Sequence, residues 1–178
     1  MRILITGGAG FIGSNLTKRL VEDGHEVIVI DNLLRGNKLS KDIFDRITFI
    51  QGDVRDADLI MQKTIGCDVI FHFAAVLGVD IVADNPVETM DVEVIGTRNV
   101  VMAALANNIK KIMYASTSGI YGHSAFENVL TEEILVDPRT SYAMAKRYNE
   151  IYLASHHEEK GINVVSLRFF NVYGYNQD

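Results

Sequence analysis

Short runs of apolar, mostly β-branched residues recur along this chain, with longer stretches of mixed character between them. Nearly every position within a run is apolar, which is typical of strands covered on both faces, as in a parallel sheet wrapped by helices. The pattern predicts strands at residues 3–6, 27–30, 47–50, 69–73, 112–115 and 164–167.

The stretches between the strands carry the helical spacing of apolar residues. They predict helices at residues 14–22, 56–65, 90–107 and 141–160, with glycines placed to end three of them: Gly24, Gly66 and Gly161. Strands that alternate with helices indicate an α/β fold with a doubly wound parallel sheet. No repeat or linker divides the chain, so a single domain over residues 1–178 is expected.

Composition narrows the classes of partner. Of the 178 residues, 48% are hydrophobic, and the formal net charge is −6 with a pI near 5.3. This acidic balance argues against nucleic-acid binding, which depends on clustered Lys and Arg. Cys67 is the only cysteine and no apolar run approaches membrane-spanning length. We therefore expect a cytoplasmic protein with no internal disulfide and no membrane segment.

Glycines cluster directly after the first predicted strand. Gly7, Gly10 and Gly13 lie between this strand and the first predicted helix. Residues without a Cβ at such a turn let backbone amides approach a pyrophosphate at the positive end of the helix. This loop, with Phe11 and Ile12 inside it, is the predicted phosphate-binding part of a dinucleotide site in a Rossmann-like fold. A tight turn without a ligand is the alternative.

An acidic residue ends the second predicted strand, about twenty residues beyond the glycine loop. Asp31 at this place can accept hydrogen bonds from the hydroxyls of an adenosine ribose, and its charge would repel a 2′-phosphate. Arg35 lies nearby and could favour NADP, but an acid at the strand tip is the stronger indication. We predict NAD as the cofactor, with Asp31 and Asn32 among its binding residues.

Six ordered motifs extend over almost the whole chain: TGGAGFIG at 6–13, GDVRD at 52–56, HFAA at 72–75, ASTSGIYG at 115–122, YAMAK at 142–146 and RFFNVYG at 168–174. By these motifs the chain resembles the extended short-chain dehydrogenases/reductases, the family that includes nucleotide-sugar epimerases and dehydratases. The resemblance implies a bound NAD and a nucleotide-sugar substrate.

The resemblance also assigns roles to individual residues. It implies that Asp53 and Val54 meet the adenine and that three residues after the fourth strand line the cofactor: Phe73, Ala74 and Ala75. From burial preference alone, Val54 and Phe73 are as well suited to a place in the core as to contact with the cofactor. Asn171 matches the position expected to touch the substrate diphosphate, and Ser118 is a weaker candidate for substrate contact. His72 is interpreted as a packed strand residue.

Tyr142 and Lys146 lie four residues apart on a predicted helix, so both can face one bound molecule. A tyrosine has an ordinary pKa of about 10, and a nearby ammonium can lower it. With Lys146 and the positive nicotinamide ring to favour the phenolate, Tyr142 could remove a sugar hydroxyl proton. Thr117, at the end of the fifth strand, is placed to hydrogen-bond the same oxygen. A surface pair on an amphipathic helix is the alternative.

The residues after Thr117 bear on the reaction. Related dehydratases place Asp and Glu there, whereas this chain has Ser118 and Gly119, so elimination lacks its acid and base. We therefore favour epimerisation of a nucleotide sugar, similar to UDP-glucose 4-epimerase, through a transient keto intermediate. A decarboxylase remains the main alternative enzyme because residues 78–86 look like that branch. A non-catalytic NAD-binding module is the alternative from another class.

Three departures from the family pattern are visible. Glu93 stands where the family usually has Asn, which fits either a solvated helix charge or a changed water network in the active site. Tyr175 replaces the proline that normally follows the last motif. The chain ends at Asp178, whereas relatives continue into a smaller substrate-binding domain, so that domain is expected to be absent. Water exclusion would then be incomplete, and we expect NAD binding to survive and turnover to be poor.

The predicted helices at 90–107 and 141–160 offer apolar faces. In relatives the equivalent helices form a two-fold, four-helix dimer contact, so a homodimer is expected, with ordinary packing inside the domain as the alternative. His156 and His157 are adjacent and point in different directions on their helix, so they are interpreted as solvated residues. No metal site is predicted.

Overall fold

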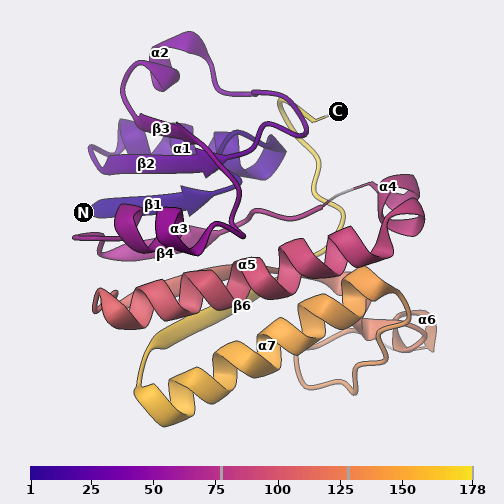
Figure 1. Cartoon of the computed structure of the whole chain (residues 1–178). Coiled ribbons are helices and arrows are strands. Elements are labelled where there is room, and N and C mark those ends of the chain that lie inside the picture. Colours follow the sequence, from indigo (N-terminus) through magenta and orange to yellow (C-terminus); the bar gives the residue numbers. More distant parts are fainter. Residues whose placement is uncertain (77, 128, 178) are drawn as a thin grey trace.

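Six parallel strands form one sheet in the computed structural model of the chain, which describes residues 1–76, 78–127 and 129–177 (Figure 1). Their order across the sheet is β3-β2-β1-β4-β5-β6, so the chain starts in the middle and winds outward in both directions. The strands are β1 (Arg2–Thr6), β2 (Glu26–Asp31), β3 (Thr48–Gln51), β4 (Val69–His72), β5 (Lys111–Thr117) and β6 (Asn163–Phe169).

Helices lie on both faces of this sheet. α3, α5 and α7 cover one face, and α1 with the short α2 packs on the other, against β1 and β2 (Figure 1). The helices are α1 (Phe11–Glu22), α2 (Lys41–Phe44), α3 (Ala57–Lys63), α4 (Val79–Asp84), α5 (Pro86–Ala106), the 3-10 turn η1 (Ser118–Tyr121), α6 (Ser124–Glu127) and α7 (Ser141–Lys160). The predicted doubly wound α/β fold is therefore confirmed.

The alternation of side chains along β1 divides the core into two layers. Leu4 packs with the cluster under α3, α5 and α7, while Ile3 and Ile5 pack with the cluster under α1. All three side chains are 0–1% exposed. Each strand residue thus contributes to one of the two layers, which explains why the apolar runs are continuous in the sequence.

Local signals fix the ends of the helices near the cavity. The Thr140 hydroxyl accepts a hydrogen bond from the Ala143 N–H at the start of α7, and the Asp56 carboxylate does the same for the Leu59 N–H in α3. Gly161 ends α7 in the left-handed conformation, with φ of 74°. α7 is thereby held with its first turns, which carry the YAMAK motif, close to the ends of the strands.

The predicted boundaries are close to those observed, with three informative differences. α1 begins at Phe11, so the last part of the glycine motif belongs to the helix. α5 begins at Pro86 and not at residue 90, because proline is well suited to the first turn of a helix. β5 reaches Thr117, the residue predicted to stand at its end. None of the helices in the described ranges has the length and apolar character that a membrane crossing requires.

His72 is buried in β4, as predicted, and both ring nitrogens have hydroxyl partners. Nδ1 lies 2.7 Å from the Thr6 hydroxyl and Nε2 lies 3.0 Å from the Thr97 hydroxyl, so the ring links β1, β4 and α5. Burial, assisted by the positive charge of Lys146, lowers the pKa of His72 to about 3. The folded protein therefore keeps this imidazole neutral at pH values where an unfolded chain protonates it.

This depressed pKa predicts a loss of stability in mild acid. The contribution of a neutral His72 is complete above the ordinary histidine pKa of about 6.5 and decreases as the pH falls toward 3. Between pH 6.5 and 5 we expect the free energy of unfolding to fall by about 2 kcal/mol from this residue, measured by urea unfolding. His72→Gln should flatten that part of the profile relative to the wild-type chain. Equal slopes in His72→Gln and the wild-type chain would contradict the assignment.

Candidate active site

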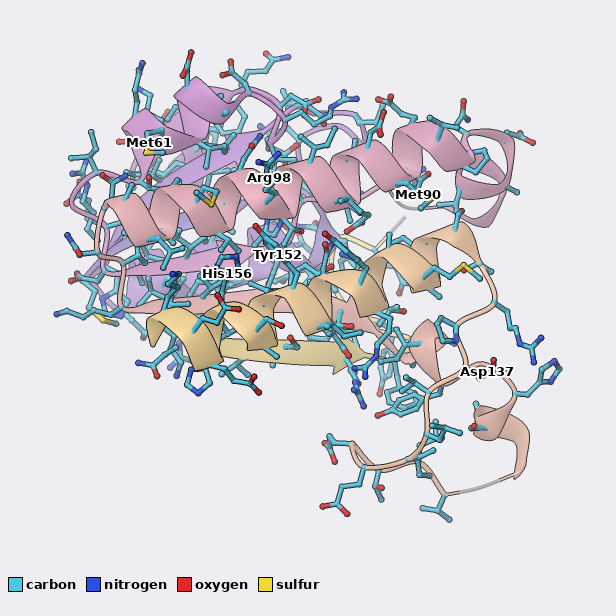
Figure 2. The ribbon with its side chains drawn as sticks, turned by 60° about the horizontal axis from the view of Figure 1, so that its bottom comes forward. Met61, Met90, Arg98, Asp137, Tyr152 and His156 are labelled. Atoms are coloured by element: carbon cyan, nitrogen blue, oxygen red, sulfur yellow. The ribbon has the colours of Figure 1, made fainter. Side chains whose placement is uncertain are left out.

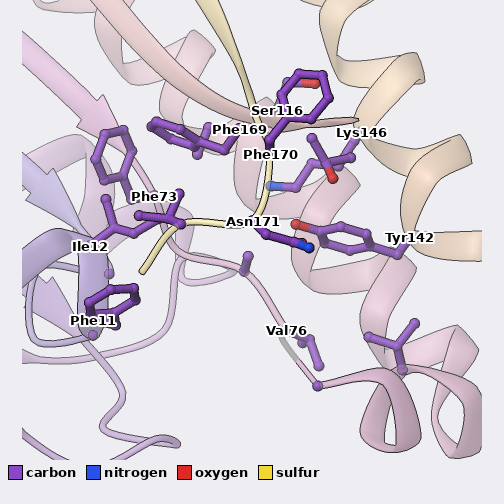
Figure 3. Close-up of a pocket in the computed structure, with 18 of the residues that line it drawn as sticks. Phe11, Ile12, Phe73, Val76, Ser116, Tyr142, Lys146, Phe169, Phe170 and Asn171 are labelled. Atoms are coloured by element: carbon purple, nitrogen blue, oxygen red, sulfur yellow. The ribbon is translucent and has the colours of Figure 1, made fainter. Parts of the chain in front are cut away.

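A cavity of about 980 Å³ opens at the carboxyl ends of β1, β4, β5 and β6 (Figure 3). This is the edge at which parallel α/β sheets bind their ligands. Its walls come from the glycine loop, the segment after β4, the end of β5, the start of α7 and the chain after β6. Of the predicted site residues, the following line it: Gly7, Gly10, Phe11, Ile12, Gly13, Phe73, Ala75, Thr117, Tyr142, Lys146 and Asn171.

The glycine loop is shaped by two close backbone approaches. Gly7 has φ of +73°, and a Cβ there would lie 2.6 Å from the Ala74 nitrogen. A Cβ on Gly13 would overlap the carbonyl oxygen of Gly7 and lie 2.8 Å from Gly8 Cα. At Gly13 the first turn of α1 therefore packs directly against the backbone of the loop. The loop presents backbone at the N-terminus of α1, an arrangement that fits a pyrophosphate.

Asp31 has a structural role in addition to its predicted one. Its Oδ2 accepts a hydrogen bond from the Ala9 N–H (2.9 Å), and its Oδ1 accepts one from the Leu33 N–H (2.8 Å). The carboxylate thus ties the glycine loop to the turn after β2. Asn32 accepts a hydrogen bond from the Leu34 N–H (3.0 Å) in the same turn. Both residues lie at the carboxyl end of β2, where the ribose contact is predicted, but outside the lining of the cavity.

Asp53 and Val54 follow β3, at the same edge of the sheet. The Asp53 carboxylate pairs with the Arg55 guanidinium at 2.7 Å, which lowers the pKa of Asp53. The Val54 side chain is 4% exposed and packs in the core, where a Cβ on Gly96 would lie 2.5 Å from it. Contact of this segment with adenine stays a prediction. Any contact of Val54 with adenine would have to come from its backbone, because its side chain packs in the core.

Lys146 lies at the floor of the cavity between two tyrosine rings and a carboxylate. Its Nζ is 2.9 Å from Glu93 Oε2, 4.8 Å from the centre of the Tyr114 ring and 5.4 Å from the centre of the Tyr142 ring. The side chains of Lys146 and Glu93 are 1% and 0% exposed. The interpretation of Glu93 as a solvated helix charge is therefore wrong, because the carboxylate is buried against the ammonium.

This cluster changes the expected ionisation of Tyr142. Burial raises the pKa of the Tyr142 phenol above its ordinary value of 10.0; Lys146 opposes the rise and Glu93 adds to it. Lys146 therefore acts in the expected direction, but in the protein alone burial outweighs its effect on the pKa of Tyr142. Burial disfavours the charge of Lys146, but the Glu93 carboxylate and the two tyrosines raise its pKa overall. Lys146 is accordingly an ammonium at neutral pH.

The end of β5 presents a hydroxyl to the cavity. Thr117 Oγ1 accepts a hydrogen bond from the Gly119 N–H at 3.1 Å, which leaves the hydroxyl hydrogen available for a ligand. Ser116, the residue before it, lines the cavity but donates to Glu150 Oε1 at 2.6 Å. Ser118 does not line the cavity. The structure therefore favours Thr117 as the residue of this segment that meets a bound molecule.

The chain after β6 borders the cavity on the side opposite α7. Asn171 extends toward Tyr142 in Figure 3, and the following residues return to the glycine side of the sheet. The Asn15 side chain donates to the Tyr175 carbonyl at 3.0 Å, and the Asn176 side chain donates to the Lys38 carbonyl at 3.1 Å. Tyr175, noted as a departure, is 82% exposed, and its backbone anchors this return.

Several lining residues were not predicted from the sequence. They include Phe169, which ends β6, and Phe170 after it, together with Val76 and Val82 on the segment that includes α4. Phe169 lies edge-on to the Phe73 ring at a centroid distance of 5.9 Å. A signal for the two phenylalanines was available, because Phe169 and Phe170 belong to the RFFNVYG motif and directly precede Asn171. In the described ranges we find no group of three His, Cys, Asp or Glu residues that could hold a metal.

The glycine loop and the Tyr142–Lys146 pair line one cavity, and Asp31 at the end of β2 is hydrogen-bonded to that loop, an arrangement typical of a dinucleotide-binding domain. The chain belongs to the NAD dependent epimerase/dehydratase family, which matches residues 3–178. The predicted family is thus confirmed, and NAD as its cofactor agrees with the prediction from Asp31.

Relatives in this family include both epimerases and decarboxylases. The chain is 36% identical over 183 residues to UDP-glucose 4-epimerase of Mycolicibacterium smegmatis, covering 100% of this chain and 58% of the relative. It is 36% identical over 178 residues to UDP-N-acetyl-alpha-D-glucosaminuronate decarboxylase of Bacillus cytotoxicus, covering 97% and 55%. Among solved structures, UDP-glucose 4-epimerase of Thermus thermophilus in complex with NAD matches with a TM-score of 0.90 and 34% identity, covering 100% and 58%. The chain thus spans a little over half of the length of these relatives.

Proposed function

We propose that this chain is the NAD-binding and proton-transfer part of an enzyme that epimerises a UDP-sugar. The observation that carries the proposal is the position of Tyr142 and Lys146 on the same cavity as the glycine loop. NAD would lie with its pyrophosphate at Gly7, Gly10 and Gly13, where missing Cβ atoms leave the backbone accessible. Bound there, it supplies reversible hydride acceptance and return.

The chain's own residues then handle the proton. The Thr117 hydroxyl donates a hydrogen bond to the reacting sugar oxygen: its oxygen accepts from the Gly119 N–H, and its hydrogen remains available. In its phenolate form, the Tyr142 oxygen accepts the proton of that sugar hydroxyl and later returns it. Lys146 stabilises the phenolate form by its charge. Ser118 and Gly119 carry no acid, which favours epimerisation over elimination.

Cofactor choice is tested first. Titration of the chain with NAD and with NADP, followed by calorimetry, should give the tighter dissociation constant for NAD, because the Asp31 carboxylate disfavours a 2′-phosphate. Tighter binding of NADP would contradict the assignment. Asp31→Asn removes the charge and should narrow the difference, although it also alters the hydrogen bonds to Ala9 and Leu33.

The reaction is tested by incubating the NAD-loaded chain with UDP-glucose or UDP-galactose and following their interconversion. We expect slow conversion in both directions, because the chain holds the reacting groups but spans only 55–58% of the relatives. Release of carbon dioxide from a UDP-hexuronic acid, with no interconversion of the neutral sugars, would replace epimerisation by decarboxylation. The decarboxylase relative supports that second candidate.

The surfaces of α5 and α7 support an assembly as part of the same proposal. These helices pack side by side, and their outer faces carry half-exposed apolar residues (Figure 2). On α5 these are Met90, Ile95 and Met102, and on α7 they are Met144, Tyr148 and Ile151, each between 41% and 52% exposed. We propose that a second copy of the chain covers this face through a four-helix contact.

A further inference from the structure

Glu93 has no role in the proposed reaction, although its carboxylate is buried directly beside Lys146. It lies on α5, on the same buried stripe as Gly96, Thr97 and Val100. Its Oε2 contacts the Lys146 ammonium at 2.9 Å, and its Oε1 makes no hydrogen bond to any part of the chain that the structure describes. A buried carboxylate in this state is costly unless a charge compensates it.

At 2.9 Å the two side chains form a buried ion pair. A neutral Glu93 would leave the ammonium of Lys146 uncompensated in a site that is 1% exposed, and this is the more costly arrangement. Burial raises the pKa of Glu93, and the adjacent ammonium opposes that rise. The carboxylate therefore offsets the one cationic side chain that contacts the Tyr142 ring among the described residues.

We propose that Glu93 is a positioning residue of this site: it holds the Lys146 ammonium against α5 and offsets the positive charge that Lys146 presents to Tyr142. The backbone around it is fixed as well, because the Asn149 side chain donates to the Glu93 carbonyl at 3.0 Å and to the Tyr114 hydroxyl at 2.9 Å. The proposal rests on the proposed function only in naming Tyr142 as the proton-transfer residue.

Other ionisable groups around Lys146 do not substitute for Glu93. Tyr114 from β5 and Tyr142 from α7 face the ammonium. Its charge also lowers the pKa of His72 in β4. Burial raises the pKa of Tyr114, so it is a neutral phenol, and His72 is a neutral imidazole with a pKa of about 3. Glu93 is thus the one anion in this cluster at neutral pH, among the described residues. The Tyr142 phenol then keeps its proton until a further positive charge enters the cavity.

The test is a titration of Tyr142 in the chain without cofactor or sugar. Tyrosine labelled with ¹³C at Cζ reports each phenol by NMR, and Tyr142→Phe assigns the signal. Glu93→Gln keeps the shape and an acceptor for Lys146 but removes the charge. We expect the midpoint of Tyr142 to fall by about one pH unit or more, because a charge a few ångströms away in a buried site is removed.

Two variants serve as controls. Glu93→Asp keeps the charge and should leave the Tyr142 midpoint close to that of the wild-type chain. Glu88→Gln removes a carboxylate from the same helix, but Glu88 is 54% exposed and pairs with Arg55, so the midpoint should not move. An unchanged midpoint in folded Glu93→Gln would overturn the proposal.

A double variant covers the case in which Glu93→Gln alone does not fold. Glu93→Gln with Lys146→Met removes both charges and leaves neither buried alone. If the two charges offset each other at Tyr142, its midpoint in the double variant should stay within about one pH unit of the wild-type value. A larger displacement would refute the offset. Because no turnover is measured, failure of the epimerase assay leaves this result intact.

Discussion

Replacing Tyr142 with Phe is expected to reduce UDP-sugar interconversion by about 10² to 10⁴, the usual contribution of a positioned acid or base. The change removes only the phenol oxygen, so the ring still lines the cavity beside Lys146. NAD affinity should change by less than about fivefold, because a single neutral hydrogen bond contributes about 1 kcal/mol. Parallel turnover assays and NAD titrations of the two proteins measure both quantities.

Tyr148→Phe is the matched control for this prediction. Tyr148 is one turn and two residues further along α7, is 51% exposed and stacks on Tyr152 away from the cavity. The Tyr148→Phe variant should therefore have the turnover and the NAD affinity of the wild-type chain. If the wild-type chain and Tyr142→Phe both bind NAD and neither converts a sugar, the epimerase proposal loses its support. A non-catalytic NAD-binding module would then be the better description.

The parts of this molecule that were predictable from sequence are those whose signal is local. The glycine loop lies within seven residues, and its steric requirement appears directly as missing side chains at Gly7 and Gly13. The strands were recognisable because residues such as Ile3 and Leu4 are buried on opposite faces. The position of Thr117 at the end of β5 was predictable as well, because the apolar run of this strand leads directly into the motif at 115–122.

The ionisation of Tyr142 was not predictable in this way, because it depends on burial and on groups from two helices, α5 and α7. Lys146 is a near neighbour in sequence, but Glu93 comes from α5, some fifty residues earlier. A signal for its burial existed: Glu93 is three, four and seven residues before Gly96, Thr97 and Val100, the spacing of one helix face. What the spacing could not give was the partner, because the approach of α5 to α7 is a tertiary contact.

Gly13→Ala is expected to disrupt the phosphate-binding turn strongly. The added Cβ would meet the Gly7 carbonyl oxygen and Gly8 Cα, both of them backbone atoms that no side-chain rotation can move. Alanine favours a helix by about 1 kcal/mol over glycine, but overpacking of this kind costs about 1–3 kcal/mol and shifts the backbone. We expect a lower melting temperature. We also expect a loss of NAD affinity of tenfold or more, which corresponds to about 1.4 kcal/mol.

Gly10→Ala separates the steric effect from the mere loss of a glycine. A Cβ on Gly10 would lie 3.5 Å from the Gly7 carbonyl oxygen, an ordinary contact, and Gly10 precedes α1 with φ of −75°. Thermal unfolding should therefore place Gly10→Ala near the wild-type chain and Gly13→Ala below it. If the two variants unfold at the same temperature and bind NAD equally, the close approach of α1 to the Gly7 carbonyl does not limit the site. In that case the glycine loop would owe its sequence to something other than the packing of this helix on β1.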